Sequence, residues 1–126
     1  MVTGTVNAKR DAVIKLSVYG KQNQVIEIEA VIDTGYTGFL ILPLQMIEML
    51  ELTYLAHTES MLANGKMEDF AVYAATVDWD GQKRLIEVDA TGADPLIGMS
   101  LLDGYELRIQ VIPEGLVTIE LLNPSL

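Results

Sequence analysis

The chain has 126 residues, half of them hydrophobic, and it contains no cysteine. This length and composition fit a single domain, residues 1–126, with its own hydrophobic core. Eight Lys and Arg against 18 Asp and Glu give a formal net charge of −10, which argues against binding of nucleic acid through its phosphates. The lack of cysteine excludes disulfides, a thiolate nucleophile and cysteine-ligated zinc or iron–sulfur sites.

Signals for export or membrane insertion are missing from the sequence. No apolar segment follows the basic pair Lys9–Arg10, and no apolar run approaches the roughly 18 residues that cross a bilayer. We therefore expect a cytoplasmic protein with no membrane partner.

Short segments rich in Val, Ile, Leu, Thr and Tyr recur along the chain with alternating character, which predicts an all-β fold. Strands are predicted at 12–19 and 25–32, joined by a turn at Gly20–Asn23. In the second strand Glu27 and Glu29 alternate with apolar residues, so that one face is charged and the other apolar.

The pattern changes after residue 32. Asp33–Thr34–Gly35 interrupts the strand, and an extended segment resumes at 39–42. Pro43 is placed to begin a short helix that continues to about Leu50.

The remainder of the chain is again dominated by strands. Between 52 and 90, Asn64–Gly65 and Asp78–Gly81 predict two consecutive hairpins. The elements predicted after these are a short apolar segment at Leu96–Gly98, a helical turn at 99–103 that stops at Gly104, and strands at 105–111 and 116–122.

The most informative segment for function is Asp33–Thr34–Gly35, which follows Ala30–Val31–Ile32. A carboxylate at the end of an apolar strand is costly unless it is solvated, paired or used. The order of strand, loop, apolar pair with glycine, and helix occurs around Asp33 and again, without a carboxylate in the loop, around Leu96–Ile97–Gly98. The Asn64–Gly65 hairpin lies between these two segments. Together these segments resemble retropepsin-like aspartic proteases, most closely the short bacterial and archaeal members of that clan.

The resemblance implies an acid-protease fold, an all-β half-barrel with one or two short helices that forms a homodimer around a peptide or protein substrate. It implies a mid-chain hairpin that folds over the substrate, and a C-terminal strand, 116–122, that pairs across the dimer. The implied site residues are Asp33, Thr34 and Gly35 in catalysis, and Ala63, Asn64, Gly65, Tyr36 and Ile97 in substrate binding.

The chemistry of peptide hydrolysis agrees with this arrangement. Without a metal ion or a covalent nucleophile, one group must take a proton from water and another must donate one. Two carboxylates that share a proton can do both, because like charges about 3 Å apart cannot both ionise. The chain has a single Asp-Thr-Gly segment, so a dimer that joins two copies of Asp33 supplies the pair, with no metal or organic cofactor.

Tyr36 departs from the family pattern, because members commonly have a small residue directly after Asp-Thr-Gly. It leaves open a second hypothesis, a dimeric peptide-binding module of the same fold with little or no catalytic activity. A monomeric β domain without a cleft function is the third.

Two other patterns carry less weight. Thr76–Gly81 with Glu87 matches part of an EF-hand calcium loop, but its flanks are strand-like and Thr76 replaces the first carboxylate. His57 is the sole histidine, and Ser60 nearby lacks a nucleophile elbow, which argues against a serine hydrolase and against a His-rich zinc site.

Overall fold

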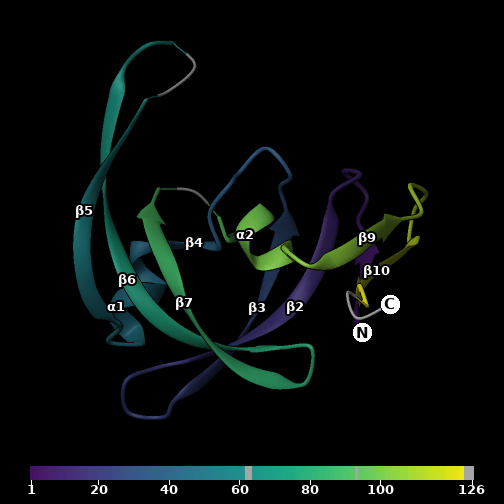
Figure 1. Ribbon diagram of the computed structural model, residues 1–126, viewed down its shortest axis with the longest axis horizontal. Helices are drawn as coiled ribbons and strands as arrows, with labels where there is room; N and C mark the ends of the chain where they lie inside the picture. Colours follow the sequence, from purple (N-terminus) through teal and green to yellow (C-terminus); the bar gives the residue numbers. More distant parts are fainter. Residues whose placement is uncertain (62–63, 93, 124–126) are drawn as a thin grey trace.

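The structure is a computed structural model that describes residues 1–61, 64–92 and 94–123, and these residues form ten strands and two short helices (Figure 1). The strands are β1 (Val2–Val6), β2 (Ala12–Tyr19), β3 (Val25–Ile32), β4 (Leu40–Pro43), β5 (Thr53–Met61), β6 (Met67–Trp79), β7 (Gln82–Thr91), β8 (Leu96–Ile97), β9 (Tyr105–Ile109) and β10 (Leu116–Leu121). The helices are α1 (Leu44–Met49) and α2 (Met99–Leu102). The prediction of a mostly β fold with one or two short helices is confirmed.

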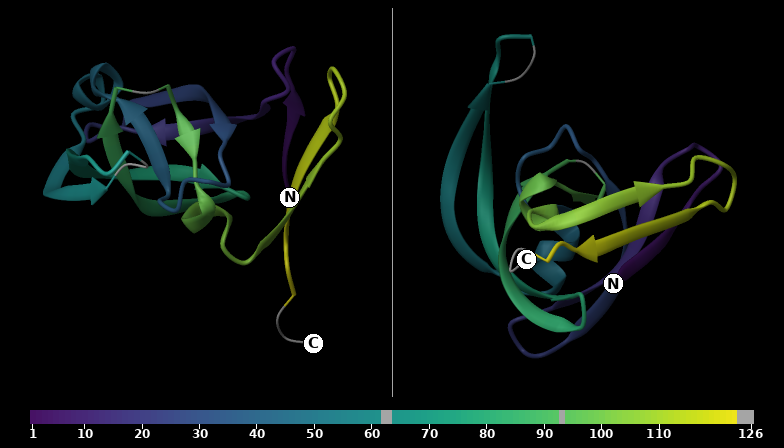
Figure 2. Two further views of the ribbon diagram at one scale, coloured as in Figure 1. Left: turned by 90° about the horizontal axis from the view of Figure 1, so that it is seen from above. Right: turned by 45° about the vertical axis from the view of Figure 1, so that its right-hand side comes forward.

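Part of the sheet closes into a barrel. The strand order is β5-β6-β7-β4-β8-β3-β2-β1-β10-β9, and β6 also pairs with β2, which joins β6, β7, β4, β8, β3 and β2 into a ring. The extra pairing is short, Val18 with Val77 and Tyr19 with Thr76. The strands β1, β10 and β9, here called the arm, continue from β2 and stand apart from the barrel (Figure 2).

The predicted strands 12–19 and 25–32 have the bounds of β2 and β3. They pair antiparallel across the Gly20–Asn23 turn, where Asn23 has a φ of 63°. The core-facing residues of β2 are Ala12, Ile14, Leu16 and Val18, and Glu27 and Glu29 of β3 are exposed, as the alternation predicts. The two later hairpins are also confirmed, with β6 placed between β5 and β7.

The short helix begins one residue later than predicted. Pro43 is the last residue of β4 and pairs with Thr91, and α1 runs from Leu44 to Met49. A φ of −66° suits Pro43 to either position, but its ψ of 149° is extended, so it caps the helix from outside.

The strand β1 was not predicted. Gly4 interrupts its β-branched residues, and glycine weakens a strand unless another backbone approaches closely. Such an approach occurs here, because a Cβ on Gly4 would lie 2.1 Å from the carbonyl oxygen of Val13 in β2.

The expected pairing of the C-terminal strand across a dimer is wrong for β10. Both of its edges are already occupied within the chain, by β1 on one side and β9 on the other. The outer strand of the arm is therefore β9. None of the helices in the described ranges has the length and apolar character needed to span a membrane.

Candidate active site

The loop at residues 33–39 connects β3 to β4, and β8 lies between these two strands. Val31 and Ile32 of β3 run parallel to Leu96 and Ile97 of β8, whose other edge pairs antiparallel with β4. The two segments that resemble each other in sequence are thus brought side by side.

Backbone hydrogen bonds hold the 33–39 loop against the 97–100 segment. The N–H of Asp33 donates to the carbonyl oxygen of Ile97 at 2.9 Å. Further N–H groups donate from Gly98 to Phe39 at 3.1 Å, from Met99 to Tyr36 at 2.8 Å and from Ser100 to Gly38 at 3.1 Å. The Ser100 hydroxyl donates to the carbonyl oxygen of Thr37. These bonds give the loop a defined position.

The Asp33 side chain is half-buried at the end of β3. The side-chain Oδ1 of Asp33 accepts a hydrogen bond from the N–H of Gly35 at 2.9 Å. The backbone carbonyl oxygen of Asp33 accepts one from the N–H of Tyr36 at 3.1 Å. Thr34 and Gly35 are exposed. The turn therefore holds one carboxylate oxygen and leaves the tip of the loop open to solvent.

Cavities lie on both sides of this tip. One, here called the hairpin-side cleft, has a volume of about 480 Å³ and extends from Gly35 to the β5–β6 hairpin, which rises beyond the barrel in Figure 1. The other, the arm-side cavity, has a volume of about 450 Å³ and extends from Thr34 past α2 to Tyr105 and Leu107 of β9. Asp33–Thr34–Gly35 thus separates the hairpin from the arm.

Tyr36 is built into the wall of the hairpin-side cleft. Its hydroxyl donates a hydrogen bond to Oδ2 of Asp89 in β7, and a Cβ on Gly38 would lie 2.2 Å from the Tyr36 hydroxyl oxygen. Burial raises the pKa of Tyr36 well above its ordinary value, and the hydrogen bond to Asp89 adds to this shift. The phenol is therefore neutral and remains a donor.

Removal of this hydroxyl should weaken the fold. We expect Tyr36→Phe to lower the free energy of unfolding by about 1–2 kcal/mol at neutral pH, because Asp89 loses its hydrogen-bond donor. Since the pKa of Tyr36 is raised in the folded state, its contribution is fully present below about pH 10 and is lost as the pH rises further.

Urea unfolding of wild type and variant at neutral pH and above about pH 10 measures this effect. The gap between the two proteins should narrow at the higher pH. Tyr73→Phe is the matched control, because no hydrogen bond of the Tyr73 hydroxyl is found among the described residues. An equal loss in both variants would mean that the bond to Asp89 contributes nothing specific.

The other described site residues that were predicted, Asn64, Gly65 and Ile97, do not line the hairpin-side cleft. Asn64 and Gly65 form the exposed turn of the β5–β6 hairpin, where Gly65 has a φ of 82° and Oδ1 of Asn64 accepts the N–H of Lys66 at 3.0 Å. Neither lines the hairpin-side cleft, and Ala63 lies outside the described residues. The Ile97 side chain is fully buried in the core, so Ile97 reaches the loop through its carbonyl oxygen.

Several residues of the cleft were missed in the sequence. The β5–β6 hairpin contributes Glu59, Glu68 and Phe70, and β7 contributes Asp89. The available signal was Asp89 itself, a carboxylate placed between the apolar residues Val88 and Ala90. The other three show no local pattern that separates them from ordinary hairpin residues.

The side chains of the two weaker motifs form ordinary structural contacts. Asp78 lies in β6 and accepts a hydrogen bond from the Tyr19 hydroxyl, while Asp80 lies in the β6–β7 turn and accepts one from the N-terminal ammonium group. Nδ1 of His57 shares a hydrogen bond with the Tyr54 hydroxyl. In the part of the chain that the structure describes, no three His, Asp or Glu side chains are grouped to hold a metal ion.

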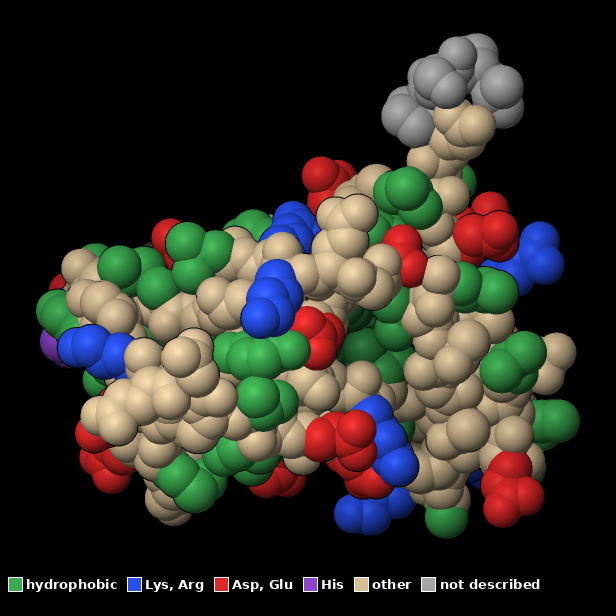
Figure 3. Space-filling view, turned by 90° about the horizontal axis from the view of Figure 1, so that it is seen from below, with side chains coloured by type: hydrophobic (Ala, Val, Ile, Leu, Met, Phe, Trp, Pro, Cys, Tyr) green, Lys and Arg blue, Asp and Glu red, His purple; other side chains and the backbone are tan. Residues whose placement is uncertain are grey.

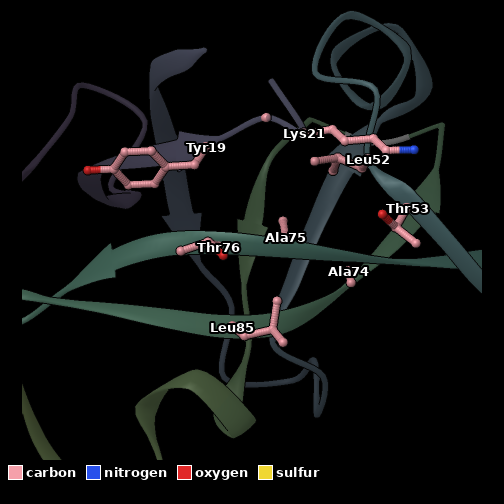
Figure 4. Close-up of a pocket in the computed structure, with 9 residues that line it drawn as sticks. Tyr19, Lys21, Leu52, Thr53, Ala74, Ala75, Thr76 and Leu85 are labelled. Atoms are coloured by element: carbon pink, nitrogen blue, oxygen red, sulfur yellow. The ribbon is translucent and has the colours of Figure 1, made fainter. Parts of the chain in front are cut away.

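A smaller cavity of about 150 Å³ lies between β2, β6 and the residues that follow α1 (Figure 4). Tyr19, Lys21, Leu52 and Leu85 are among its lining residues, and no predicted site residue is. It therefore plays no part in the candidate site.

Comparison with known proteins identifies the architecture. No family model and no curated protein sequence matches the chain. A retropepsin-like aspartic protease from Rickettsia conorii matches its structure with a TM-score of 0.64 and 20% identity, over 95% of this chain and 89% of that chain. The chain has a retropepsin-like fold.

A second solved structure has a related architecture. The foamy viral protease–reverse transcriptase, in complex with an RNA/DNA hybrid, matches with a TM-score of 0.53 and 20% identity, over 79% of this chain and 13% of that chain. The resemblance inferred from Asp33–Gly35 and Leu96–Gly98 is confirmed for the fold. In the retropepsin-like fold of this chain, those two segments are the ones that β8 brings together.

Proposed function

We propose that the chain is an aspartic endopeptidase that acts as a homodimer. The supporting observation is the position of Asp33, half-buried on a hydrogen-bonded loop between two cavities and supplied once per chain. Two copies of Asp33 would hold a water molecule between them, one carboxylate taking its proton while the other, protonated, donates to the peptide carbonyl.

The surface beside Thr34 supports the dimer. The arm-side cavity joins Thr34 to β9, which is the outer strand of the arm. Figure 3 shows hydrophobic side chains exposed over the arm, at the right of the view. A second subunit would cover this surface and place its own Asp33 near the first.

Each remaining site residue has a role in this proposal. Thr34 hydroxyls would bond the two loops to each other, and the lack of a side chain at Gly35 would let its backbone approach the carboxylate. The β5–β6 hairpin, with Asn64 and Gly65 at its turn, would cover the substrate and exclude water. Ile97 receives a positioning role through its carbonyl oxygen rather than a contact with the substrate.

The second candidate function is a dimeric peptide-binding module without catalysis. The observation that favours it is Tyr36, whose ring fills the space over Gly38 and narrows the cleft beside Gly35. Cleavage of a diverse peptide mixture, measured beside Asp33→Asn, distinguishes the two functions. A confirmed wild-type dimer that cleaves nothing between mildly acidic and neutral pH would support the binding module.

Dimerisation should depend on one face of the arm. Leu121 is 59% exposed and pairs with Tyr105, on the face that also carries the buried Val117 and Ile119. We expect Leu121→Asp to raise the dimer dissociation constant about tenfold or more, because a charge would be buried in the interface.

Analytical ultracentrifugation over a concentration series measures this constant. Leu116→Asp is the matched control, because Leu116 lies in the same strand, is 47% exposed and points to the opposite face. A larger increase of the dimer dissociation constant in Leu116→Asp than in Leu121→Asp would indicate that the interface lies on the other face of the arm. A protein that is monomeric at every concentration would contradict the proposed homodimer.

A further inference from the structure

The hairpin-side cleft has two walls that come from distant parts of the chain. The 33–39 loop with β4 and β7 forms one, and the β5–β6 hairpin forms the other. The side chains that matter most are Tyr36, Ile41 and Asp89 on the first wall, and Glu68 and Phe70 on the second.

The charged side chains of this cleft are all acidic. Asp89, Glu59 and Glu68 line it, and none of its described lining residues is Lys, Arg or His. The whole chain has a formal net charge of −10. A cleft lined by one sign of charge attracts ligands of the opposite sign, so a cationic ligand is favoured here.

Asp89 is the most enclosed of the three carboxylates. It is half-buried in β7 next to the fully buried Val88, and its Oδ2 accepts the Tyr36 hydroxyl. Neither of the ion pairs found in the described ranges involves Asp89. An enclosed carboxylate without a cationic partner costs free energy, and a cation supplied by a ligand would offset that cost.

Apolar side chains make up the rest of the cleft. Ile41 is buried, Phe70 is half-buried, and the Tyr36 ring lies beside them in the lining. A Lys or Arg side chain packs its methylene groups against apolar surface while its charged end reaches polar partners. The aromatic faces of Tyr36 and Phe70 add a further attraction for a cation.

We infer that the hairpin-side cleft is a subsite for a lysine or arginine side chain of an extended peptide. The methylene stem lies against Ile41 and Phe70, and the cation is held by Asp89 with Glu68 at the hairpin. The inference rests on the proposed function, because it names the substrate class of the same site. Tyr36 sets the depth of the subsite, since its bond to Asp89 closes the space toward Gly38.

The test compares two sets of synthetic peptides that are identical except at one position, which carries lysine in one set and norleucine in the other. Norleucine keeps the unbranched four-carbon stem and lacks the ammonium group. Binding to the Asp33→Asn dimer is measured by fluorescence anisotropy, and cleavage by the wild type is measured as kcat/KM. We expect about a tenfold preference for lysine in both measurements, falling as the salt concentration rises.

Variants of the cleft carboxylates show which residues cause the preference for lysine. Asp89→Asn keeps an oxygen that can accept the Tyr36 hydroxyl but removes the charge, and it should reduce the preference for lysine to about twofold. Glu68→Gln, on the exposed hairpin, should also reduce the preference, and it tests the effect of charge without any change in β7.

Asp69→Asn is the control, because Asp69 lies between Glu68 and Phe70 and points to the other face of the hairpin, outside the cleft. It should leave the preference unchanged. An equal loss in Asp69→Asn would show that overall charge, rather than this cleft, selects lysine.

The two proposals fail differently. Cleavage by the wild type without any preference for lysine overturns the subsite and leaves the peptidase standing. Binding that prefers lysine and depends on Asp89, in a wild type that cleaves nothing, supports the subsite and overturns the peptidase. Binding of both peptide sets with equal affinity overturns the subsite whatever the catalytic result.

Discussion

Asp33→Asn is expected to lower kcat for peptide cleavage by about 10³-fold or more, because an amide can neither take a proton from water nor donate one to the peptide. The Asn side chain keeps an oxygen that can accept the Gly35 N–H, so the loop should retain its shape. KM and the dimer dissociation constant should change little. The measurement is steady-state cleavage of a peptide selected from a diverse mixture, at equal concentrations of dimer.

Glu27→Gln is the matched control. Glu27 is an exposed carboxylate of the same strand, β3, that leads into the Asp33 loop. Its removal changes the net charge by the same amount as Asp33→Asn and should leave kcat unaffected. Undiminished cleavage by Asp33→Asn would exclude Asp33 from the chemistry.

Mixing the two proteins tests whether the site is shared between subunits. After subunit exchange with an excess of Asp33→Asn, almost every wild-type chain is paired with an inactive one. If both copies of Asp33 are needed, the activity per wild-type chain should fall nearly to that of the variant. Activity that is merely diluted, in proportion to the wild-type fraction, would mean that each chain has a complete site.

Gly98→Ala is expected to lower both the stability of the protein and its activity. A Cβ at this position would lie 2.2 Å from the carbonyl oxygen of Gly38 and 2.5 Å from Cδ2 of Tyr36. The 33–39 loop would have to move away from β8, which lowers the free energy of unfolding by about 1–3 kcal/mol. Because the same loop carries Asp33, cleavage should fall as well.

Thermal unfolding measures the loss, at roughly 4 °C of melting temperature for each kcal/mol in a domain of this size. Gly92→Ala is the control, because nothing lies within 4 Å of a Cβ at Gly92. A Gly98→Ala protein with unchanged melting temperature and activity would show that the loop can shift without cost, and that β8 does not fix its position.

Much of the barrel could be predicted from the sequence, because the patterns involved are local. Alternation of apolar and charged residues gives β2 and β3 the bounds they have in the structure, since successive side chains of a strand point to opposite faces. Gly65, Gly81 and Gly104 stop or turn the chain where they were expected, each with a positive φ. The Asp33 loop was identified for the same reason, as a polar break in an apolar strand.

The similarity between the Asp33 and Gly98 segments went beyond a local pattern. It predicted that two distant segments belong to one site, and β8 does lie between β3 and β4. The resemblance did not indicate that Ile97 would turn its side chain into the core and reach the loop through its carbonyl oxygen. A backbone hydrogen bond does not depend on the side chain, so the residue type at position 97 could not indicate this contact.

What the sequence by itself determined was the set of strands and turns of the barrel and the one loop with a carboxylate. Only the tertiary structure decided that Val2–Val6 is a strand, that both edges of β10 are occupied, and that Asp89 and Glu68 line the same cleft. Strands and turns depend on residues a few positions apart, whose spacing can be seen in the sequence. The arm and the cleft depend on pairings between strands far apart in the chain, and packing of the whole sheet selects these pairings.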